Sequence, residues 1–341
     1  MYTVADLKEL GYSLIKEGEE FERAIGDFLL DWFNDRPTLS LGTSGSTGDP
    51  KIIEVRKAHM INSALATGAF FKMGAGTRAL LCLPSKFIAG KMMLVRAMFL
   101  GWDLHGIRPA SAPLIPLGKD YDFCAMVPLQ VQNSLSRLHR IGTLLVGGAP
   151  LPPELRSRLS GEAIRAYETY GMTETVSHIA LREIDDNLVD GTGFKALPEV
   201  VFSQDQRDCL VIQAPKIFDG TITTNDVVRL ISDTEFQWLG RHDHIINSGG
   251  IKLIPEQIEL KLSPLFSSRF FVAGIPDKTL GQKLVLLIEG EIDSELLLQN
   301  IRGLKSLSKY EVPKEIYSVP HFLETENEKI RREATLRALG L

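Results

Sequence analysis

Nine consecutive residues near the N-terminus concentrate groups that bind phosphate. The segment is Thr43-Ser44-Gly45-Ser46-Thr47-Gly48-Asp49-Pro50-Lys51. Its glycines let the backbone turn sharply and bring N–H groups close to an anion, while hydroxyls and an ammonium add further donors. The spacing to Lys51 and the apolar Ile52 after it exclude a Walker A loop. We therefore predict a phosphate-binding turn that leads into a strand, with a flexible glycine–serine linker as the alternative.

A second segment that could do chemistry is Tyr170-Gly171-Met172-Thr173-Glu174-Thr175, which follows a predicted strand. The carboxylate of Glu174 could hold Mg²⁺, and the hydroxyl of Thr173 could donate to a phosphate. A Thr-Glu pair also caps the start of many helices. Taken alone, the segment therefore leaves both a metal site and a helix N-terminus open.

Three later features carry weaker signals. Asp226 precedes Arg241 by fifteen residues, and such a pair could bind ribose hydroxyls, although a surface ion pair is the ordinary interpretation. Gly249 and Gly250 precede a proline-started helix, which is typical of a loop and a helix N-terminus. Lys329 lies in a basic C-terminal stretch, where a lysine is normally solvated.

The elements that must position these residues follow from the spacing of apolar residues. Residues 1–36 have helical periodicity. Between residues 79 and 170, apolar runs alternate with amphipathic stretches, which predicts an α/β layer with a largely parallel sheet. The predicted strands are 79–83, 122–127, 143–146 and 163–167, and the predicted helices are 88–100, 128–139 and 152–160.

The second half of the chain is richer in turns and β-formers. Its predicted strands are 209–213, 227–231 and 235–238, followed by helices at 255–262, 293–303 and 329–338 and strands at 270–275, 283–289 and 315–319. We therefore predict an α/β protein in which a large N-terminal α/β domain with layered sheets precedes a small mobile α+β C-terminal domain. The predicted boundaries are 1–239 for the first domain, 240–244 for a hinge and 245–341 for the lid domain.

Composition narrows the class of protein. The 341 residues are 44% hydrophobic and 24% charged, as in an ordinary globular protein of two or three domains. A net charge of −5 without a basic block argues against nucleic acid as the main partner. Cys82, Cys124 and Cys209 match no metal spacing and lie in apolar runs, which indicates buried thiols in a cytoplasmic enzyme. No segment has the character of a signal peptide or a membrane span.

The order and spacing of these motifs resemble the acyl-adenylate-forming superfamily, which includes acyl-CoA synthetases, adenylation domains of peptide synthetases and luciferases. The resemblance extends from about residue 40 to the C-terminus. It implies ATP-binding roles for Thr43, Ser44, Gly45, Ser46, Thr47, Gly48, Lys51, Tyr170, Gly171, Asp226 and Arg241. It further implies catalytic roles for Lys329, Thr173 and Glu174 (Glu174 as the Mg²⁺ ligand), a hinge at Asp243, an acyl segment at Gly147 and Gly148, and a CoA path along Gly249 and Gly250.

The sequence departs from the family pattern at three positions. Asn225 stands where a glycine normally precedes the ribose aspartate. His244 replaces an acid that normally follows the hinge residue, and Glu328 replaces a glycine before the catalytic lysine. Because the residues with direct chemical roles are kept, we expect an active enzyme, with a catalytically impaired relative as the alternative.

The chain has only 42 residues before the phosphate-binding segment, far fewer than most family members. This compact build is similar to the o-succinylbenzoate–CoA ligases of the superfamily, and residues 83–91 support that choice. Here Lys86, assigned to the acyl site, and then Lys91 and Arg96 bring positive charge where many acyl-CoA synthetases have an aromatic–histidine pair. An acid with a second carboxylate would need such a partner. Solvated helix residues are the alternative for Lys91 and Arg96.

The resemblance implies an ATP- and Mg²⁺-dependent acid–thiol ligase. The carboxylate of a small-molecule acid, o-succinylbenzoate first, would attack the α-phosphorus of ATP to give an acyl-AMP. The C-terminal domain would then swing about Asp243, and the thiol of CoA would displace AMP. The alternatives are a ligase for another aryl or acyl acid, an adenylation enzyme that loads a carrier protein, and a non-catalytic nucleotide-binding protein. A homodimer is left open, and neither nucleic acid nor stable membrane insertion is expected.

Overall fold

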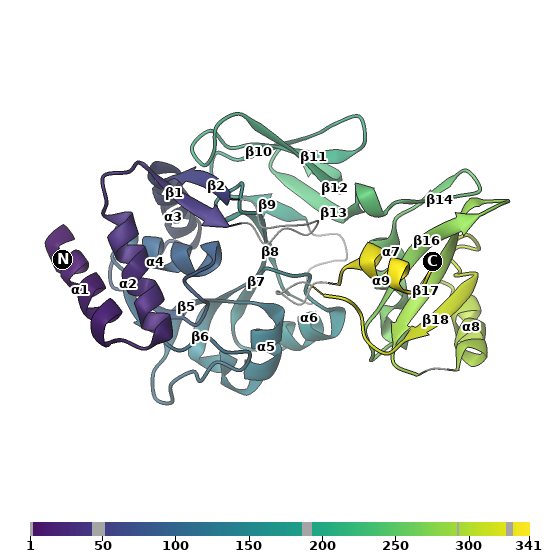
Figure 1. Ribbon diagram of the computed structural model, residues 1–341, viewed down its shortest axis with the longest axis horizontal. Coiled ribbons are helices and arrows are strands. Elements are labelled where there is room, and N and C mark those ends of the chain that lie inside the picture. The colour runs from purple at the N-terminus through teal and green to yellow at the C-terminus, as the bar shows by residue number, and fades with distance from the viewer. Residues whose placement is uncertain (1–2, 43–51, 186–192, 292, 325–329) are drawn as a thin grey trace.

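The computed structural model describes residues 3–42, 52–185, 193–291, 293–324 and 330–341 (Figure 1). A helical hairpin, a small two-stranded sheet, a large mixed sheet and a C-terminal sheet follow one another along the chain. In Figure 1 the hairpin lies at one end of the molecule and the C-terminal sheet at the other, with the large sheet between them. The predicted division into a large α/β part and a smaller α+β part is confirmed as a fold class.

The helical character predicted for residues 1–36 is confirmed, and it takes the form of two helices. The bounds are α1 Val4–Glu17 and α2 Glu20–Trp32. The first helix ends at Gly18, whose backbone is extended. Phe28 and Trp32 of the second helix belong to the main hydrophobic core, so α2 attaches the hairpin to the rest of the molecule.

A short antiparallel pair encloses the predicted phosphate-binding segment in the sequence. The bounds are β1 Thr38–Gly42 and β2 Ile52–Arg56. β2 confirms the strand predicted after Lys51. The segment at residues 43–51 itself lies outside the described residues, so its phosphate-binding role stays a prediction.

Within the described residues, eleven strands form the large sheet in the order β10-β11-β12-β13-β9-β8-β7-β6-β5-β3-β4. Their bounds are β3 Arg78–Leu81, β4 Asp103–Gly106, β5 Tyr121–Met126, β6 Ile141–Val146, β7 Arg165–Gly171, β8 His178–Glu183, β9 Phe194–Ala196, β10 Val201–Gln204, β11 Cys209–Gln213, β12 Thr221–Ser232 and β13 Glu235–Arg241. The pairs among β3–β7 are parallel, and those from β7 to β10 are antiparallel. The largely parallel sheet predicted for residues 79–170 is therefore confirmed in β3–β7. The strands after β7 are antiparallel, because parallel neighbours need long crossovers and the later connections are short.

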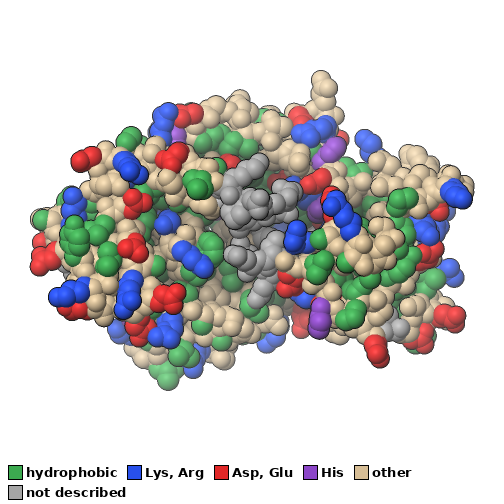
Figure 2. All heavy atoms as spheres, viewed as in Figure 1, with side chains coloured by type: hydrophobic (Ala, Val, Ile, Leu, Met, Phe, Trp, Pro, Cys, Tyr) green, Lys and Arg blue, Asp and Glu red, His purple; other side chains and the backbone are tan. Residues whose placement is uncertain are grey.

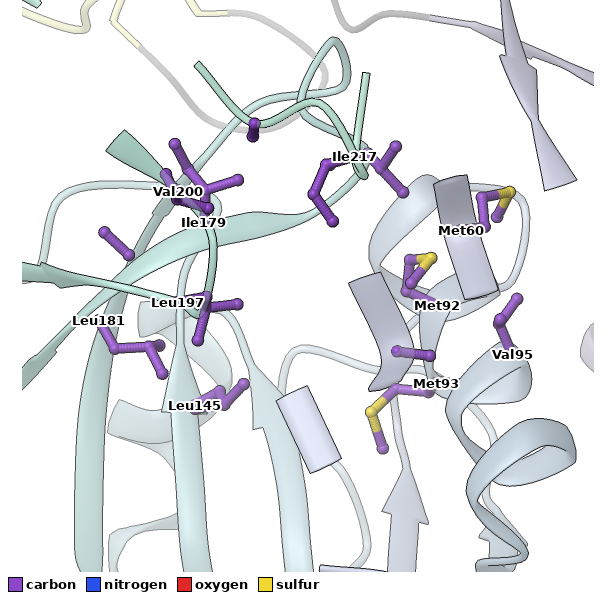
Figure 3. Packing of buried hydrophobic residues seen from close by; sticks show 14 of the residues in the cluster. Met60, Met92, Met93, Val95, Leu145, Ile179, Leu181, Leu197, Val200 and Ile217 are labelled. Carbon is purple, nitrogen blue, oxygen red and sulfur yellow. The ribbon is translucent and has the colours of Figure 1, made fainter. Parts of the chain in front are cut away.

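Helices cover both faces of the parallel half. α3 (Lys57–Phe71) and α4 (Ile88–Leu100) pack on one face, and α5 (Pro128–Ser134), the 3₁₀ helix η1 (Leu135–Arg140) and α6 (Pro153–Ser160) pack on the other. The helix predicted at 128–139 is thus an α-helix that continues as a 3₁₀ helix. In the first core, Met92 and Met93 of α4 lie across from Leu145 and Ile179 of the sheet (Figure 3).

The chain passes from the large sheet to the C-terminal sheet between Arg241 and Ile246, across the predicted hinge. The C-terminal elements are η2 His242–His244, β14 Ile246–Ser248, β15 Ile251–Leu253, α7 Pro255–Leu262, η3 Ser263–Leu265, β16 Phe270–Asp277, β17 Gly281–Glu289, α8 Ser294–Gly303, β18 Glu315–Val319 and α9 Arg332–Ala338. Two small cores lie on either side of this sheet. The helix predicted at 329–338 begins only at Arg332, because Ile330 is extended and forms a bridge to Glu324. The exact domain limits stay a prediction.

The surface charge and the burial of the cysteines agree with what the composition indicates. The face seen in Figure 2 interleaves acidic and basic side chains over both parts of the molecule. All three cysteines are buried thiols, as predicted. None of the helices in the described part of the chain combines the length and the apolar character that crossing a bilayer requires.

Candidate active site

The end of β7 and the antiparallel strands β12 and β13 bring three predicted site residues into contact. The phenol of Tyr170 donates a 2.6 Å hydrogen bond to Oδ2 of Asp226. Nη1 of Arg241 lies 3.7 Å from Oδ1 of the same carboxylate. Asp226 and Arg241 are cross-strand partners, which explains how residues fifteen positions apart meet. We call Tyr170, Asp226 and Arg241, together with Trp238, the nucleotide corner.

Trp238 is a member of this corner that sequence reasoning missed. Its indole Nε1 donates a 3.1 Å hydrogen bond to Oδ1 of Asp226, whose side chain is almost buried at 7% exposure. The sequence-level interpretation of Asp226 as a surface carboxylate is therefore wrong. The signal for Trp238 was only its place on the same strand as Arg241, which does not reveal that its ring turns toward β12.

The corner is electrostatically complete without a ligand. Arg241 makes two 3.1 Å hydrogen bonds to Asp243, and this contact raises the pKa of the guanidinium. Burial, followed by the negative charge of Asp226, raises the pKa of Tyr170 well above its ordinary value, so its phenol stays a hydrogen-bond donor. Each charge in the corner thus has an opposite charge or a donor beside it.

The predicted acyl segment lies next to this corner. Gly147 and Gly148 follow β6, and β6 is the parallel neighbour of β7. A Cβ atom on Gly147 would lie 2.1 Å from Oγ1 of Thr169, so a larger residue here would displace the Thr169 hydroxyl from its position. Because the carboxyl ends of parallel strands share one edge, the Gly147–Gly148 loop and Tyr170 occupy the same edge of the sheet.

The predicted metal and phosphate residues lie in a tight turn between β7 and β8. Gly171 ends β7, and the turn begins after it, so the alternative of a helix start at Thr173 is wrong. The hydroxyl of Thr175 accepts from the backbone N–H of Met172 at 2.9 Å and holds the turn closed. Within it Thr173 is half-buried and Glu174 is exposed, so both side chains are available to a ligand.

This turn is strained. Val176, a buried β-branched residue, has φ of 65°, in the left-handed region. Such a conformation costs about 1–3 kcal/mol and persists where packing enforces it, often at functional sites. The strained residue Val176 separates Thr173 and Glu174, which precede it in the sequence, from Ser177, which follows it.

Arg96 is buried with only 2% exposure, so the alternative that it is a solvated helix residue is wrong. Its Nε donates to Oγ1 of Thr67 at 3.3 Å, and its Nη2 donates to Oγ of Ser177 at 3.0 Å. His178 lies beside it, with Nδ1 at 3.5 Å from Nη2. Arg96 has no acidic partner in the described part of the chain. We call Arg96, Thr67, Ser177 and His178 the arginine cluster.

Burial lowers the pKa of Arg96 to about 10, so the guanidinium remains charged at neutral pH. Burial and then the nearby Arg96 charge lower the pKa of His178 well below its usual value, so this imidazole is neutral. The cluster therefore carries one positive charge, surrounded by neutral groups, in a buried setting.

Lys86 and Lys91 lie elsewhere. Both line a cavity of about 620 Å³ against α2, together with Asp27 and Asp31. Lys86 is exposed over the ring of Phe87, whereas burial lowers the pKa of half-buried Lys91. The assignment of Lys86 to the acyl site stays a prediction, and Arg96 is the cation that the structure buries.

The predicted hinge and thiol path lie at the start of the C-terminal part. Asp243 is within the short 3₁₀ helix η2. Gly249 and Gly250 form the turn between β14 and β15, with φ of 58° and 84°, which favours glycine at both positions. The predicted ATP-binding residues of the segment 43–51 and the predicted catalytic lysine lie outside the described residues, namely Thr43, Ser44, Gly45, Ser46, Thr47, Gly48, Lys51 and Lys329.

Two of the departures from the family pattern have partners. Nδ1 of His244 lies 2.5 Å from Oε1 of Glu256. Glu256 is on α7, and its side chain is nearly buried. Oδ1 of Asn225 accepts a 3.1 Å hydrogen bond from Arg207. Both residues are therefore integrated in the fold, while Glu328 lies outside the described residues.

Comparison with known proteins agrees with this arrangement. A model of the AMP-binding enzyme family matches residues 34–202. The structure of an acyl-CoA synthetase (AMP-forming)/AMP-acid ligase II-like protein from Dyadobacter fermentans is 38% identical and covers 97% of this chain and 98% of its own, with a TM-score of 0.64. The chain therefore belongs to the family of AMP-binding enzymes.

Within that family, several similar proteins share one name. The 2-succinylbenzoate–CoA ligase of a Geobacillus species is 25% identical over 88% of this chain and 68% of its own length. The Escherichia coli enzyme of that name is 24% identical over 95% of this chain and 76% of its own. The O-succinylbenzoate coenzyme A synthetase of Bacillus subtilis, in complex with ATP and magnesium ion, shares the fold with a TM-score of 0.74 at 18% identity, over 87% of this chain and 69% of its own. The short build is thus shared with the Dyadobacter protein, while the named ligases are longer.

Proposed function

We propose that the protein is an AMP-forming acid–thiol ligase that activates o-succinylbenzoate and transfers the acyl group to CoA. The observation that carries the choice of acid is the arginine cluster, a buried positive charge without an acidic partner in the described residues. The names of its relatives, 2-succinylbenzoate–CoA ligases, support the same acid.

The cost of a buried charge supports a ligand with a second carboxylate. An ion taken out of water costs several kcal/mol unless an opposite charge or hydrogen bonds compensate it. Neutral groups of the cluster supply hydrogen bonds to Arg96 but no negative charge. A bound dicarboxylic acid would supply that charge with one carboxylate and leave the other free to react. A monocarboxylic acid would leave Arg96 uncompensated.

The nucleotide corner supports ATP as the second substrate. Asp226 accepts from Tyr170 and Trp238 with one lone pair on each oxygen, so a further lone pair on each oxygen remains for ribose hydroxyls. The adjacent loop of Gly147 and Gly148 offers backbone close to the same strand edge. The acid-binding Arg96 and the nucleotide corner are joined through the turn from Gly171 to His178.

In the first step, an oxygen of the reacting carboxylate forms a bond to the α-phosphorus of ATP, and the bond to pyrophosphate breaks. Catalysis of such a step is chiefly positioning and stabilisation of negative charge. In our proposal the segment of residues 43–51, Thr173 and Lys329 contribute donors to the phosphates. An exposed carboxylate such as Glu174 suits Mg²⁺, which commonly binds one or two carboxylates together with substrate phosphates. When bound there, the ion would neutralise phosphate charge.

In the second step, the CoA thiol adds to the acyl carbonyl and AMP leaves. The proposal includes a rotation of the C-terminal part about Asp243, which would withdraw Lys329 and bring the Gly249–Gly250 turn toward the thiol. The two glycines carry no side chain, which is compatible with a narrow path for an extended thiol.

The test separates the two half-reactions. Lys329→Ala should reduce adenylate formation from o-succinylbenzoate and ATP, measured as pyrophosphate release, by about a hundredfold or more because a charge-stabilising donor is lost. Thioester formation from supplied acyl-adenylate and CoA should change much less. Equal loss of both half-reactions would contradict the role of Lys329. Wild-type protein that forms no AMP with o-succinylbenzoate, ATP, Mg²⁺ and CoA would overturn the proposed reaction.

A further inference from the structure

The hydrogen bonds around Arg96 have directions that can be derived from chemistry. The hydroxyl of Thr67 lies 3.0 Å from the backbone oxygen of Ser63, one turn earlier in α3. A carbonyl oxygen only accepts, so the single proton of that hydroxyl points to Ser63. The oxygen of Thr67 can therefore only accept from its other neighbours. These are Nε of Arg96 and Nε2 of His178, each at 3.3 Å.

This direction fixes the tautomer of His178. To contact an oxygen that only accepts, Nε2 must carry the proton. Because the imidazole is buried beside a guanidinium and therefore neutral, Nδ1 then has a lone pair. The hydroxyl of Ser177 lies 3.3 Å from Nδ1 and can donate to it. The same hydroxyl accepts from Nη2 of Arg96 at 3.0 Å.

The result is a closed network that holds one edge of the guanidinium. Thr67 accepts from Nε and Ser177 accepts from Nη2, while His178 contacts both hydroxyls and its Nδ1 also lies 3.5 Å from Nη2. Nη1 has a different environment. Its contact in the described part of the chain is the thioether of Met93 at 3.8 Å, a weak acceptor. Donors on the Nη1 side are therefore the ones left for a ligand.

We propose that His178 is a positioning residue for recognition of the second carboxylate of the acid. It rests on the proposed function, in which Arg96 meets that carboxylate. His178, as the neutral Nε2–H tautomer, orders Thr67 and Ser177 so that they hold Nε and Nη2 of Arg96 and present Nη1. A guanidinium fixed in this way loses less conformational entropy when a carboxylate binds than a free one does.

The three elements that form the network also connect the acid to the nucleotide side. Thr67 lies on α3 and Arg96 on α4, whereas Ser177 and His178 follow the strained turn that carries Thr173 and Glu174. As the Nε2–H tautomer, His178 thus links Arg96 to the turn that carries Thr173 and Glu174.

The experiment compares two acids with each variant, namely o-succinylbenzoate and its analogue without the ring carboxylate, 4-oxo-4-phenylbutanoate. Pyrophosphate release gives kcat and KM for each acid. His178→Phe keeps a planar ring but removes both nitrogens. We expect the ratio of kcat/KM for o-succinylbenzoate to kcat/KM for the analogue to fall by about tenfold, through KM, because one charged hydrogen-bonded contact is weakened. His178→Gln, whose amide nitrogen can take the place of Nε2 as a donor to Thr67, should recover part of this ratio.

A matched pair at Thr67 tests the network without changing the histidine. Thr67→Val keeps the shape and removes the hydroxyl, while Thr67→Ser keeps the hydroxyl. The first should lower the ratio of the two acids by several-fold, to about the extent expected of one hydrogen bond, and the second should preserve it. Thermal unfolding of each variant gives the loss of stability separately.

The outcomes separate the two proposals. Equal losses with both acids in His178→Phe and Thr67→Val would show a purely structural role and overturn the inference. If Arg96→Met removes the preference for o-succinylbenzoate but the His178 and Thr67 variants keep it, the inference also falls while the proposed function stands. If Arg96→Met leaves the preference unchanged, the proposed acid site itself is wrong. A selective fall in the ratio in all three positions supports both.

Discussion

The nucleotide corner and the arginine cluster solve the problem of charge burial in opposite ways. In the corner, Asp226 has two donors and a guanidinium nearby, and Arg241 has Asp243. In the cluster, Arg96 is more completely buried and has only neutral partners among the described residues. A complete site can bind a ligand that is neutral at the point of contact, such as a ribose. An incomplete site favours a ligand that brings the missing charge.

The comparison also separates function from stability. A compensated charge contributes to folding and to binding together, since removing one member leaves the other unpaired. An uncompensated buried charge has a cost in the free protein that is recovered only with ligand bound. Removing a charge from either region should therefore lower activity. In the nucleotide corner it should also lower stability, whereas in the arginine cluster it should leave stability unchanged or raise it.

The largest expected effect is at Arg96. Arg96→Met should lower kcat/KM for o-succinylbenzoate by about a hundredfold or more, because the carboxylate would be buried without a cation. The free energy of unfolding, measured with urea, should stay unchanged or rise by about 1 kcal/mol, because an apolar side chain replaces a buried charge. A loss of stability above about 3 kcal/mol would show that Arg96 is structural, and would erase the contrast between the two regions.

The next effect is expected at Asp226. Asp226→Asn keeps the shape and an oxygen that accepts from Tyr170, but removes the negative charge. KM for ATP should rise by about tenfold or more, since hydrogen bonds to a charged group contribute about 1.5–3 kcal/mol. The preference between o-succinylbenzoate and its analogue without the ring carboxylate should not change. A changed preference would mean that the corner and the cluster are one site.

Trp238 offers a smaller test with a matched control. Trp238→Phe removes one donor to Asp226 and should raise KM for ATP by about fivefold, as expected for one hydrogen bond of about 1 kcal/mol. Trp102→Phe is the control, because the indole N–H of Trp102 is buried and has no hydrogen-bond partner in the described part of the structure. Equal effects of the two substitutions on KM would point to general packing rather than to the bond with Asp226.

The smallest effect concerns a compensated pair far from both regions. Hydrogen bonds from Arg269 lower the pKa of Glu289 to about 2, from an ordinary value of 4.5. A carboxyl whose pKa is depressed by folding stabilises the protein above its unfolded pKa, and this contribution is lost as the pH falls through the folded pKa. Arg269 is half-exposed, so solvent screening limits the contribution to about 1 kcal/mol.

Urea unfolding of wild type and Glu289→Gln at several pH values measures this contribution. The difference in unfolding free energy should be present near pH 6 and should shrink as the pH falls from about 4.5 toward 2. A difference that does not depend on pH would mean that the carboxylate charge plays no part. Asp226 would then be the remaining example of a compensated charge to set against Arg96.

Most of the elements could be predicted because their signals are local. Helix α4 matches the predicted range of residues 88–100, and β11 matches residues 209–213. Apolar periodicity reflects which face of an element is buried, and this depends on neighbours within one or two turns. The helical character predicted for residues 1–36 is confirmed, but periodicity did not locate the break at Gly18, because the apolar spacing on either side of it is intact.

The sequence by itself determined the order of the motifs and the identity of the groups at Tyr170, Asp226 and Arg241, and these sufficed to indicate a nucleotide-binding enzyme. Only the tertiary structure decided which cation is buried. Lys91 and Arg96 lie on one helix and have the same signal in the sequence, yet Lys91 meets a cavity beside α2 while Arg96 meets residues of α3 and β8. The burial and the neighbours of a charged side chain depend on elements that are distant in the sequence, and the local pattern of residues does not predict them.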